Sequence, residues 1–433
     1  MGMILIQPTA PMPLFGIVYD KAHGHVITTV LIAMVAMMFT AISYGRMASA
    51  YPSAASVFTY VGREIHPAAG FITGWSMAME CVINLLICVI WCAQAVVNDQ
   101  LLATVLPKLP ISVWIVFFAL LFTFLNLHGI RTTAFMNEVL AGFMGFVIFV
   151  FFVAAIRYLM LHGAVAPVSY VRPFYDPKTF SPGLLLTGTS LATLTYIGFD
   201  GISTLSEEVR NPRRNILLAT VLTVVVTGLL SSLEVYAAQL VWPASKPFPN
   251  LETAFSYVAG FIGGPWLFSL VNLTLLIASL GSGMGAQLTS ARLLYGMGRG
   301  GALPRSVFGV IDPKRHIPAR NVILTGALAL IGGLFLTYDF GAQMLNFCAF
   351  ICFLGVNAAA FARYYLRADG KRNIWADAIS PVLGFLICLV ICVNLEAPAK
   401  IWGGAWLLLG IVYGTWRTRG FRVGSVEFEV PPE

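Results

Sequence analysis

The chain has 433 residues, of which 58% are hydrophobic and only 10% are charged, and its mean hydropathy is +0.83. This composition excludes an ordinary water-soluble domain and indicates a membrane protein that crosses the bilayer several times.

Apolar runs of about 17 to 25 residues recur along nearly the whole chain, and each can cross about 30 Å of hydrocarbon as a helix. About twelve runs meet this criterion. In chain order they are Met3–Tyr19, Val26–Met47, Gly70–Val97, Ile111–Leu127, Val139–Leu161, Leu184–Leu205, Ile216–Leu240, Trp266–Leu294, Val322–Tyr338, Ala342–Tyr365, Ile379–Leu395 and Ile401–Trp416. The first run lacks a basic start and a small-residue cleavage site, so we count it as a span and not as a signal peptide. The sequence therefore predicts one all-α integral domain over residues 1–433.

Lysine and arginine gather in alternate loops, beginning with the loop that follows Arg46. The opposite loops hold the remaining basic residues, which are Lys21, Lys108, Arg157, Arg172, Lys178, Lys246 and Lys400. Because basic loops stay on the cytoplasmic side, this asymmetry predicts that both termini are cytoplasmic. The net charge of +7 follows from the same bias, so we do not expect nucleic acid as a partner.

Three connections between spans have more content than a simple loop. Residues 53–67 have an amphipathic pattern, and residues 247–262 predict a short helix on the outer surface. Residues 292–321 form the longest basic connection, which we place inside.

Two spans carry helix breakers near their centres. The first contains Pro8, Pro11 and Pro13, and the sixth places Gly198 and Gly201 around Asp200. An interrupted helix exposes backbone groups that lipid cannot satisfy, so such breaks line a cavity or are buried in protein. Spans one and six occupy matching places if the first ten helices form two repeats of five. Matched broken helices point to the central site of a secondary transporter.

Three motifs resemble those of the amino acid-polyamine-organocation (APC) transporter family. They are "YPSAASVFTYVGREIHPAAGFITGW" at 51–75, "YIGFDGISTLSEEVRNPRRNI" at 196–216 and "SARLLYGMGRGGALP" at 290–304. The opening "QPTAPMPLFGIVYDKAHGHV", with "FTAISYGRMASAYPSA" further on, is similar to bacterial putrescine importers of that family. The resemblance implies alternating access and a leucine-transporter-like fold, with broken helices 1 and 6 in a 5+5 inverted repeat. The repeats would cover about 1–161 and 183–366, with two extra helices at about 379–416.

Three carboxyl groups lie inside predicted spans: Glu80 in span three, Asp200 in span six and Glu234 toward the outer end of span seven. Charges within a membrane are costly and usually functional. Each of these acids could instead be a buried group held by hydrogen bonds. Lysine and arginine are absent from matching depths, so a cationic ligand or a proton is the natural partner.

The sequence of the first span also predicts that the ligand has no carboxylate group. Amino acid carriers that resemble this family hold the α-carboxylate with free N–H groups of a Gly-Ser-Gly-like turn, whereas this chain has "PTAPMP", and proline has no N–H. We therefore predict a site for an amine without a carboxylate. Its predicted residues are Asp200, Glu80, Tyr196, Phe199, Gly198, Gly201, Thr9 and Pro11.

The predicted function is secondary active import of putrescine or a related small cationic amine through the inner membrane. The alternative is an amino acid permease or exchanger, because the "GFD" triplet around Asp200 also occurs in such carriers, whereas an acid at Glu80 resembles the putrescine-importer pattern. The scattered His66, His128 and His316 do not suggest an enzyme. We expect neither a cofactor nor a metal.

Coupling and gating have several candidates. Glu80 and Asp200 can carry a proton, and the membrane potential favours uptake of a cation. Sodium is the less favoured rival, with Ser279 and Ser282 as possible ligands, and the coupling ion stays open. Glu234 is a further coupling candidate. The predicted inner end holds Glu207, Glu208 and Arg210, which form either a gate latch or a solvated helix end.

Overall fold

The computed structural model describes residues 7–53, 55–99, 102–128, 134–162, 170–204, 211–243, 246–368 and 372–421. The first half contains α2 (Phe15–Lys21), α3 (Val26–Ala50), α4 (Val57–Glu64), α5 (Pro67–Asn98), α6 (Leu102–Val105), α7 (Ile111–Leu127), α8 (Ala134–His162), α9 (Pro182–Ala192), η1 (Thr193–Thr195) and α10 (Phe199–Ser203). The second half contains α11 (Pro212–Val241), α12 (Ala254–Gly263), α13 (Pro265–Arg299), α14 (Arg305–Phe308), α15 (Ala319–Phe335), α16 (Tyr338–Phe361), η2 (Ala362–Leu366), η3 (Trp375–Ile379), α17 (Ser380–Val393) and α18 (Ala397–Arg417).

The prediction of an all-helical membrane protein is confirmed for the described residues, which contain no strand. Seven of their helices are long and apolar enough to cross a membrane, and three more apolar helices are shorter. The segments 53–67 and 247–262 contain the short helices α4 and α12.

Two elements differ from the predictions. Helix α13 continues to Arg299, well into the segment predicted as a basic loop, because its last turns bury Leu293 and Met297 completely. Helix α12 does not merely lie on the surface: Phe255 is fully buried, and its ring lies 4.7 Å from that of Phe151 on α8. Both differences arise from apolar contacts between segments that are far apart in the chain.

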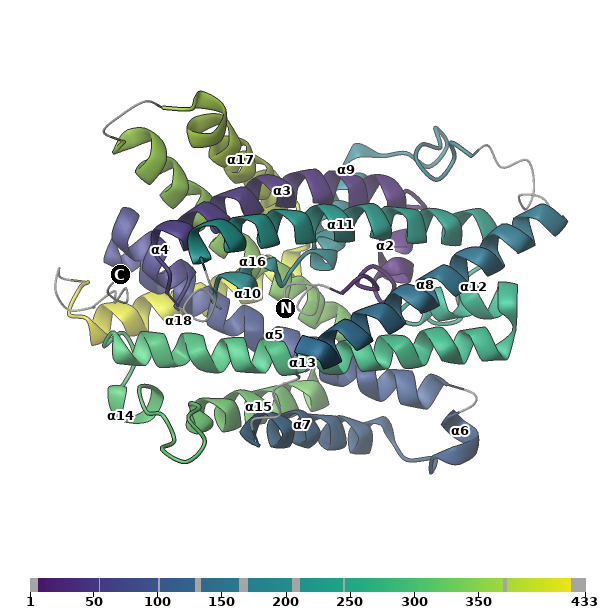
Figure 1. Cartoon of the computed structure of the whole chain (residues 1–433), viewed down its shortest axis with the longest axis horizontal. Helices are drawn as coiled ribbons and strands as arrows, with labels where there is room; N and C mark the ends of the chain where they lie inside the picture. The colour runs from purple at the N-terminus through teal and green to yellow at the C-terminus, as the bar shows by residue number, and fades with distance from the viewer. Residues whose placement is uncertain are drawn as a thin grey trace.

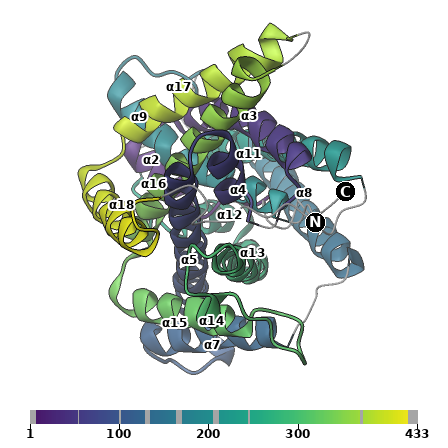
Figure 2. The ribbon, with the colours of Figure 1, turned by 90° about the vertical axis from the view of Figure 1, so that its left-hand side faces the viewer.

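Helix α5 lies in the middle of the bundle. Of the residues in the apolar stretch of α5, 83% are buried inside the protein, compared with 28% in the apolar stretch of α8. Helix α5 is therefore an inner helix and α8 a peripheral one. It packs against α13 and α16, and the end-on view in Figure 2 shows α5 and α13 side by side near the centre. Helices α7 and α15 form one flank of the bundle, and α17 lies on the opposite flank (Figure 1).

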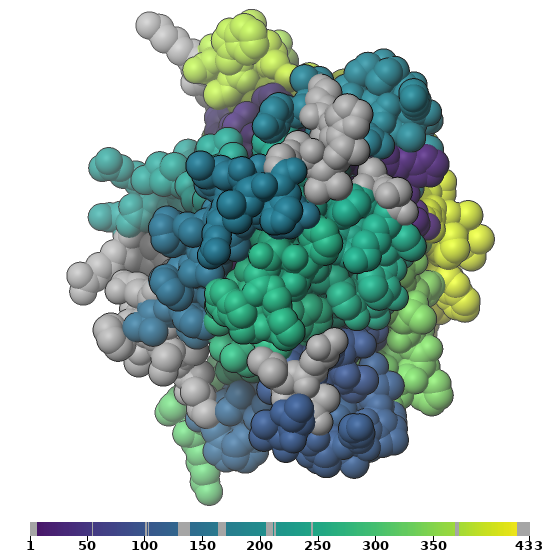
Figure 3. Space-filling view, turned by 90° about the vertical axis from the view of Figure 1, so that its right-hand side faces the viewer, coloured from purple at the N-terminus to yellow at the C-terminus, as the bar shows by residue number. Residues whose placement is uncertain are grey.

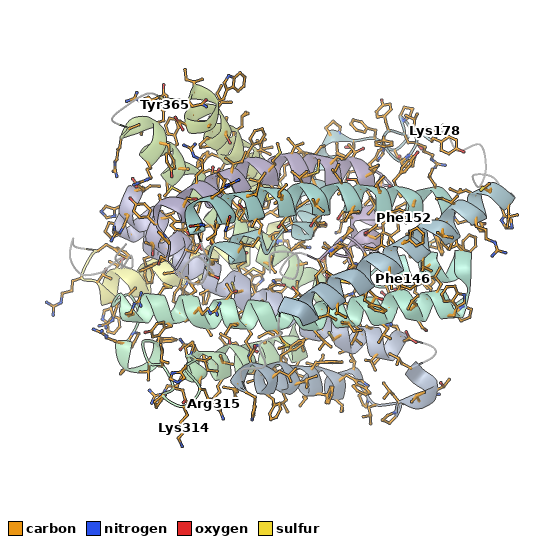
Figure 4. The ribbon with its side chains drawn as sticks, in the orientation of Figure 1. Phe146, Phe152, Lys178, Lys314, Arg315 and Tyr365 are labelled. Atoms are coloured by element: carbon orange, nitrogen blue, oxygen red, sulfur yellow. The ribbon has the colours of Figure 1, made fainter. Side chains whose placement is uncertain are left out.

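The long helices run roughly parallel to one axis, so the loops that connect them gather at the two ends of the molecule. Lys314 and Arg315 lie at one end of the molecule and Lys178 at the other (Figure 4), as expected for loops on opposite sides of a membrane. Phe146 of α8 is 57% exposed on the side of the bundle. An exposed aromatic ring there suits contact with lipid chains.

Candidate functional site

The sixth predicted span is interrupted at its glycine-flanked aspartate. Helix α9 ends at Ala192, the short turn η1 follows, and regular helix resumes at Phe199 in α10. Gly198 lies in this interruption with a φ of 121°, which residues with a side chain rarely adopt. Its N–H donates to Oδ1 of Asp200 at 3.0 Å. The interruption thus fixes the Asp200 carboxyl group at the start of α10.

The first predicted span is not helical at its described beginning. Residues 7–14 form consecutive turns, and helix α2 starts only at Phe15. The three prolines of this segment have no N–H, and the N–H groups of Ala10, Met12 and Leu14 donate to carbonyl groups of the same segment. The segment therefore has few N–H groups to offer a carboxylate ligand.

Two carboxyl groups meet at the centre of the bundle. Glu80 of α5 and Asp200 of α10 are each 2% exposed and lie within hydrogen-bonding reach of each other. Oε2 of Glu80 has no hydrogen-bond partner among the described residues, and neither acid takes part in an ion pair there. Two adjacent buried carboxylates repel each other, so a proton or a cationic ligand must offset their charge. We call Glu80 and Asp200 the central carboxyl pair.

A small cavity of about 20 Å³ adjoins the central carboxyl pair. This volume admits a single group of about the size of water, such as one ammonium group. The lining includes Glu80, Asp200, Gly198, Gly201, Asn84, Ser282 and Thr289. The structure therefore brings together four of the predicted site residues, namely both acids and both glycines.

A larger cavity of about 100 Å³ continues from the small one and shares Asn84 and Ser282 with it. Glu80, Asn84, Cys88 and Trp91 are spaced by three or four residues, so they share one face of α5. This face runs from the central carboxyl pair along the larger cavity. Sequence analysis missed Asn84 and Trp91, although their spacing from the acid of span three could have indicated them.

The first span contributes to the larger cavity through residues other than those predicted. Gln7 and Pro13 line it, and Nε2 of Gln7 donates to the carbonyl group of Ala278 on α13. The predicted residues Thr9 and Pro11 are buried but do not line either cavity, because the turns of this segment direct them elsewhere.

The predicted aromatic residues pack within the bundle. The hydroxyl group of Tyr196 donates to a carbonyl group of α3 at 2.9 Å, and the Phe199 ring contacts rings of α3 and α16. Trp75 of α5 stacks on a tryptophan of α18. None of the three lines the two cavities, whose aromatic residues are Trp91 and Tyr338. Sequence position next to a break did not reveal which way a ring points.

The coupling and gating candidates are only partly described. Glu234 is fully buried on α11 despite its place toward the helix end, and neither carboxyl oxygen has a partner among the described residues. It lies outside both cavities, so its coupling role stays a prediction. Glu207, Glu208 and Arg210 lie outside the described residues.

An ion-pair cluster around the buried Glu64, which sequence analysis missed, joins α4 to η2 just beyond the end of α16. Glu64 is 4% exposed and lies 2.7 Å from Arg363 and 3.1 Å from Arg367. It also accepts a hydrogen bond from the hydroxyl group of Tyr51 at 2.5 Å. This cluster lies near the end of the bundle that carries α14, which is the predicted cytoplasmic end (Figure 1).

A chain of two hydrogen bonds connects the same region to the site. The hydroxyl groups of Ser56, just before α4, and Ser203 of α10 are 2.6 Å apart. Ser203 donates in turn to the carbonyl oxygen of Asp200 at 2.5 Å. The backbone that carries the central aspartate is therefore in contact with the start of the amphipathic helix α4.

The apolar spans, the interrupted segments and the buried central carboxyl pair beside a cavity define an all-helical membrane protein with polar groups deep within its helix bundle. The sequence model of the family described as "Amino acid permease" matches residues 14–396. The chain therefore belongs to the amino acid permease family of APC transporters, and it is a transporter and not an enzyme.

Individual relatives differ in the substrate that their names give. The chain is 31% identical to the low-affinity putrescine importer PlaP of Escherichia coli (strain K12), over 99% of this chain and 94% of PlaP. It is 26% identical to the branched-chain amino acid permease BcaP of Lactococcus lactis subsp. cremoris, over 89% of this chain and 85% of BcaP. It is also 27% identical to cationic amino acid transporter 3, mitochondrial, of Arabidopsis thaliana, over 78% of this chain and 56% of that protein.

Proposed function

We propose that the protein is a secondary active transporter that imports putrescine or a closely related cationic amine across the inner membrane. The single observation that carries this proposal is the central carboxyl pair, which is buried beside a cavity and has no basic partner among the described residues. An ammonium group supplies the missing positive charge and donates hydrogen bonds to both acids. Similarity to PlaP over nearly the whole chain supports this choice of substrate.

In this proposal the two cavities divide the amine between them. One ammonium group occupies the small cavity at Glu80 and Asp200, and the alkyl chain extends into the larger cavity beside Asn84. The second ammonium group then lies within the larger cavity, whose lining continues toward Trp91 and Tyr338. The few free N–H groups in residues 7–14 suit a ligand without a carboxylate.

The transport cycle in this proposal is alternating access in a twelve-span, leucine-transporter-like 5+5 repeat with two additional helices. The interruptions at residues 7–14 and at Gly198 would be the points about which the half-helices move. Both termini would be cytoplasmic, together with the loop that carries Lys314 and Arg315.

The driving force in this proposal is the membrane potential, with a proton as the co-transported ion. Each positive charge gains about 2.3 kcal/mol per 100 mV of inside-negative potential. A proton on the central carboxyl pair would replace the amine during the return step, because two bare carboxylates there repel each other. Ser279 and Ser282 line the larger cavity, where we assign them to the amine and not to sodium.

A second candidate function is an amino acid permease or exchanger, which the family description and the similarity to BcaP favour. In that case Asp200 would hold the α-amino group. The α-carboxylate would then need donors that the turns of residues 7–14 largely use internally.

Competition in proteoliposomes separates the two candidates. We expect labelled putrescine to accumulate against its gradient when an inside-negative potential is applied, and unlabelled diamines to block this uptake. Zwitterionic amino acids such as leucine should compete at least about 100-fold more weakly, since their carboxylate lacks donors and meets the acids. Equal competition by leucine and putrescine would instead establish the permease function.

The substitution Gly198→Ala is expected to weaken putrescine binding about tenfold. At a φ of 121° a side chain introduces strain of about 1–3 kcal/mol, and relief of this strain displaces the N–H that donates to Asp200. The matched control is Gly145→Ala, because a Cβ at Gly145 meets open space on α8. Binding of labelled putrescine to both variants in nanodiscs gives the comparison, and wild-type affinity in Gly198→Ala would contradict the prediction.

A further inference from the structure

More carboxyl groups lie beyond the far end of the larger cavity. Trp91 and Tyr338 line that end. Nε1 of Trp91 donates to the backbone carbonyl of Glu252 at 3.4 Å, and Asp339 follows Tyr338 in the first turn of α16. The turn of Glu252 and the first turn of α16 therefore both adjoin residues that line this end, and the charge of Asp339 acts on Glu252. The larger cavity therefore leads from the central carboxyl pair toward a second group of carboxyl side chains.

The turn that carries Glu252 is held in position from two sides. Oδ1 of Asn250 accepts the N–H of Glu252 at 2.8 Å, which closes the turn. A Cβ on Gly16 of α2 would lie 2.2 Å from the carbonyl oxygen of Leu251, so the turn contacts α2 where only glycine fits. The next helix, α12, lies in the middle of this end of the molecule (Figure 3). The backbone of Glu252 is thus held by α2 and by Trp91 of α5, which lines the larger cavity.

Several buried oxygen atoms in this place have no hydrogen-bond partner among the described residues. They are Oε2 of Glu252, Oδ1 of Asp339 and Oε1 of Gln343. Gln343 is 4% exposed, and its Nε2 donates to Asp339 and to Glu396, both at 2.9 Å. An acid in the first turn of a helix is explained by the helix dipole. The dipole does not explain three unpaired acceptors, which call for a donor that the described chain does not supply.

One ammonium group of the protein already lies among these outer carboxyl groups. Nζ of Lys21, at the end of α2, lies 2.7 Å from Oε1 of Glu396, and this hydrogen bond raises the pKa of Lys21. The carboxyl groups of Glu252, Asp339 and Glu396 therefore have one ammonium group of the protein nearby, and that group is paired with Glu396. Glu252 and Asp339 take part in no ion pair among the described residues, although the charge of Lys21 also acts on Asp339.

We propose that Glu252 and Asp339 form an outer subsite that binds a primary ammonium group of an incoming amine before the amine reaches the central carboxyl pair. This inference rests on the proposed function and extends it by a second binding place on the same route. Trp91 lies three turns of α5 beyond Glu80, about 16 Å along the helix axis. A four-carbon diamine is much shorter than this, so it occupies the two places one after the other.

The test compares uptake kinetics of labelled putrescine in proteoliposomes at about pH 8. Glu252→Gln and Asp339→Asn should each raise KM about threefold to tenfold and leave the maximal rate within about twofold, because saturating amine fills the central site regardless. Asp176→Asn is the matched control, since Asp176 is an acid near the same end of the molecule that pairs with Arg172 and lines a different cavity. An unchanged KM in both variants, or an equal rise in the control, overturns the subsite.

The pH dependence gives a second readout. Burial raises the pKa of Glu252 to about 7, and the negative charge of Asp339 adds to this effect. Glu252 is charged above this pKa and neutral below it, so its attraction for an ammonium group is lost as the pH falls from about 8 to 6. The other charged groups of the cluster, Asp339, Glu396 and Lys21, are present in the wild type and in Glu252→Gln alike.

We therefore expect the KM of Glu252→Gln, divided by that of the wild type, to fall toward one as the pH is lowered. This ratio cancels any titration of the central carboxyl pair, which both proteins contain. A ratio that stays constant with pH overturns the role of Glu252.

Failure of the subsite and failure of the proposed function give different results. If the wild type binds and accumulates putrescine but both variants behave like it, only the subsite is wrong. If the wild type does not bind labelled putrescine in nanodiscs, the proposed function fails and the subsite fails with it.

Discussion

Glu80→Gln is expected to lower the affinity for putrescine at least about 100-fold and to reduce uptake in the same proportion. The substitution keeps the size of the side chain but removes one of the two charges that face an ammonium group in a buried site. Loss of such a charge-assisted contact costs about 3 kcal/mol, which corresponds to a factor of about 100 in affinity. Asp200→Asn should have an effect of similar size, because the two acids are equally buried.

Equilibrium binding of labelled putrescine in nanodiscs measures this effect without requiring turnover. Size-exclusion profiles establish that the variants fold, and Asp312→Asn is a control that removes an acid from an exposed loop far along the chain. If Glu80→Gln binds putrescine as the wild type does, the amine does not lie at the central carboxyl pair and the proposed function is wrong.

The second large effect is expected in stability. Glu64→Gln should lower the free energy of unfolding by about 2–3 kcal/mol, because it leaves Arg363 and Arg367 without the carboxylate that pairs with both. The cost is smaller than for a fully buried pair, since Arg363 is 36% and Arg367 58% exposed and water can solvate them. A lower melting temperature in nanodiscs is the expected measurement.

The exposed fractions also predict an order among the variants. Arg363→Gln should destabilise more than Arg367→Gln, because Arg363 is less exposed and also donates to Tyr51 at 2.5 Å. Arg372→Gln is the control in the same region, because its guanidinium group has no carboxylate partner among the described residues and makes a long hydrogen bond to a backbone carbonyl at 3.4 Å and a contact with the Tyr365 ring at 5.4 Å. Equal melting temperatures for Glu64→Gln and Arg372→Gln would show that the cluster does not stabilise the bundle.

Sequence analysis located the helices and the interruption in the sixth span because both are local properties. The length of an apolar run determines whether it crosses a membrane, and a pair of glycines around Asp200 permits an interruption wherever the chain is folded. The two central acids were recognised for a similar reason, since a carboxyl group in an apolar run is unusual in any context.

The rest of the site depends on which segments meet, and spacing alone does not show this. Tyr196 and Phe199 flank the interruption but point away from the cavities, whereas Tyr338 lines the larger cavity from a helix end far along the chain. Glu64 and Arg363 pair across most of the sequence, so no local pattern announces their contact. The outer subsite has the same origin, because α5, α16 and the turn before α12 supply it jointly.

The hydrogen bonds from Ser56 through Ser203 to Asp200 link the position of α10 at the site to the docking of the amphipathic helix α4. A ligand that shifts α10 enough to alter these hydrogen bonds changes how tightly α4 docks, and by the same free energy a change in that docking alters the affinity for the ligand.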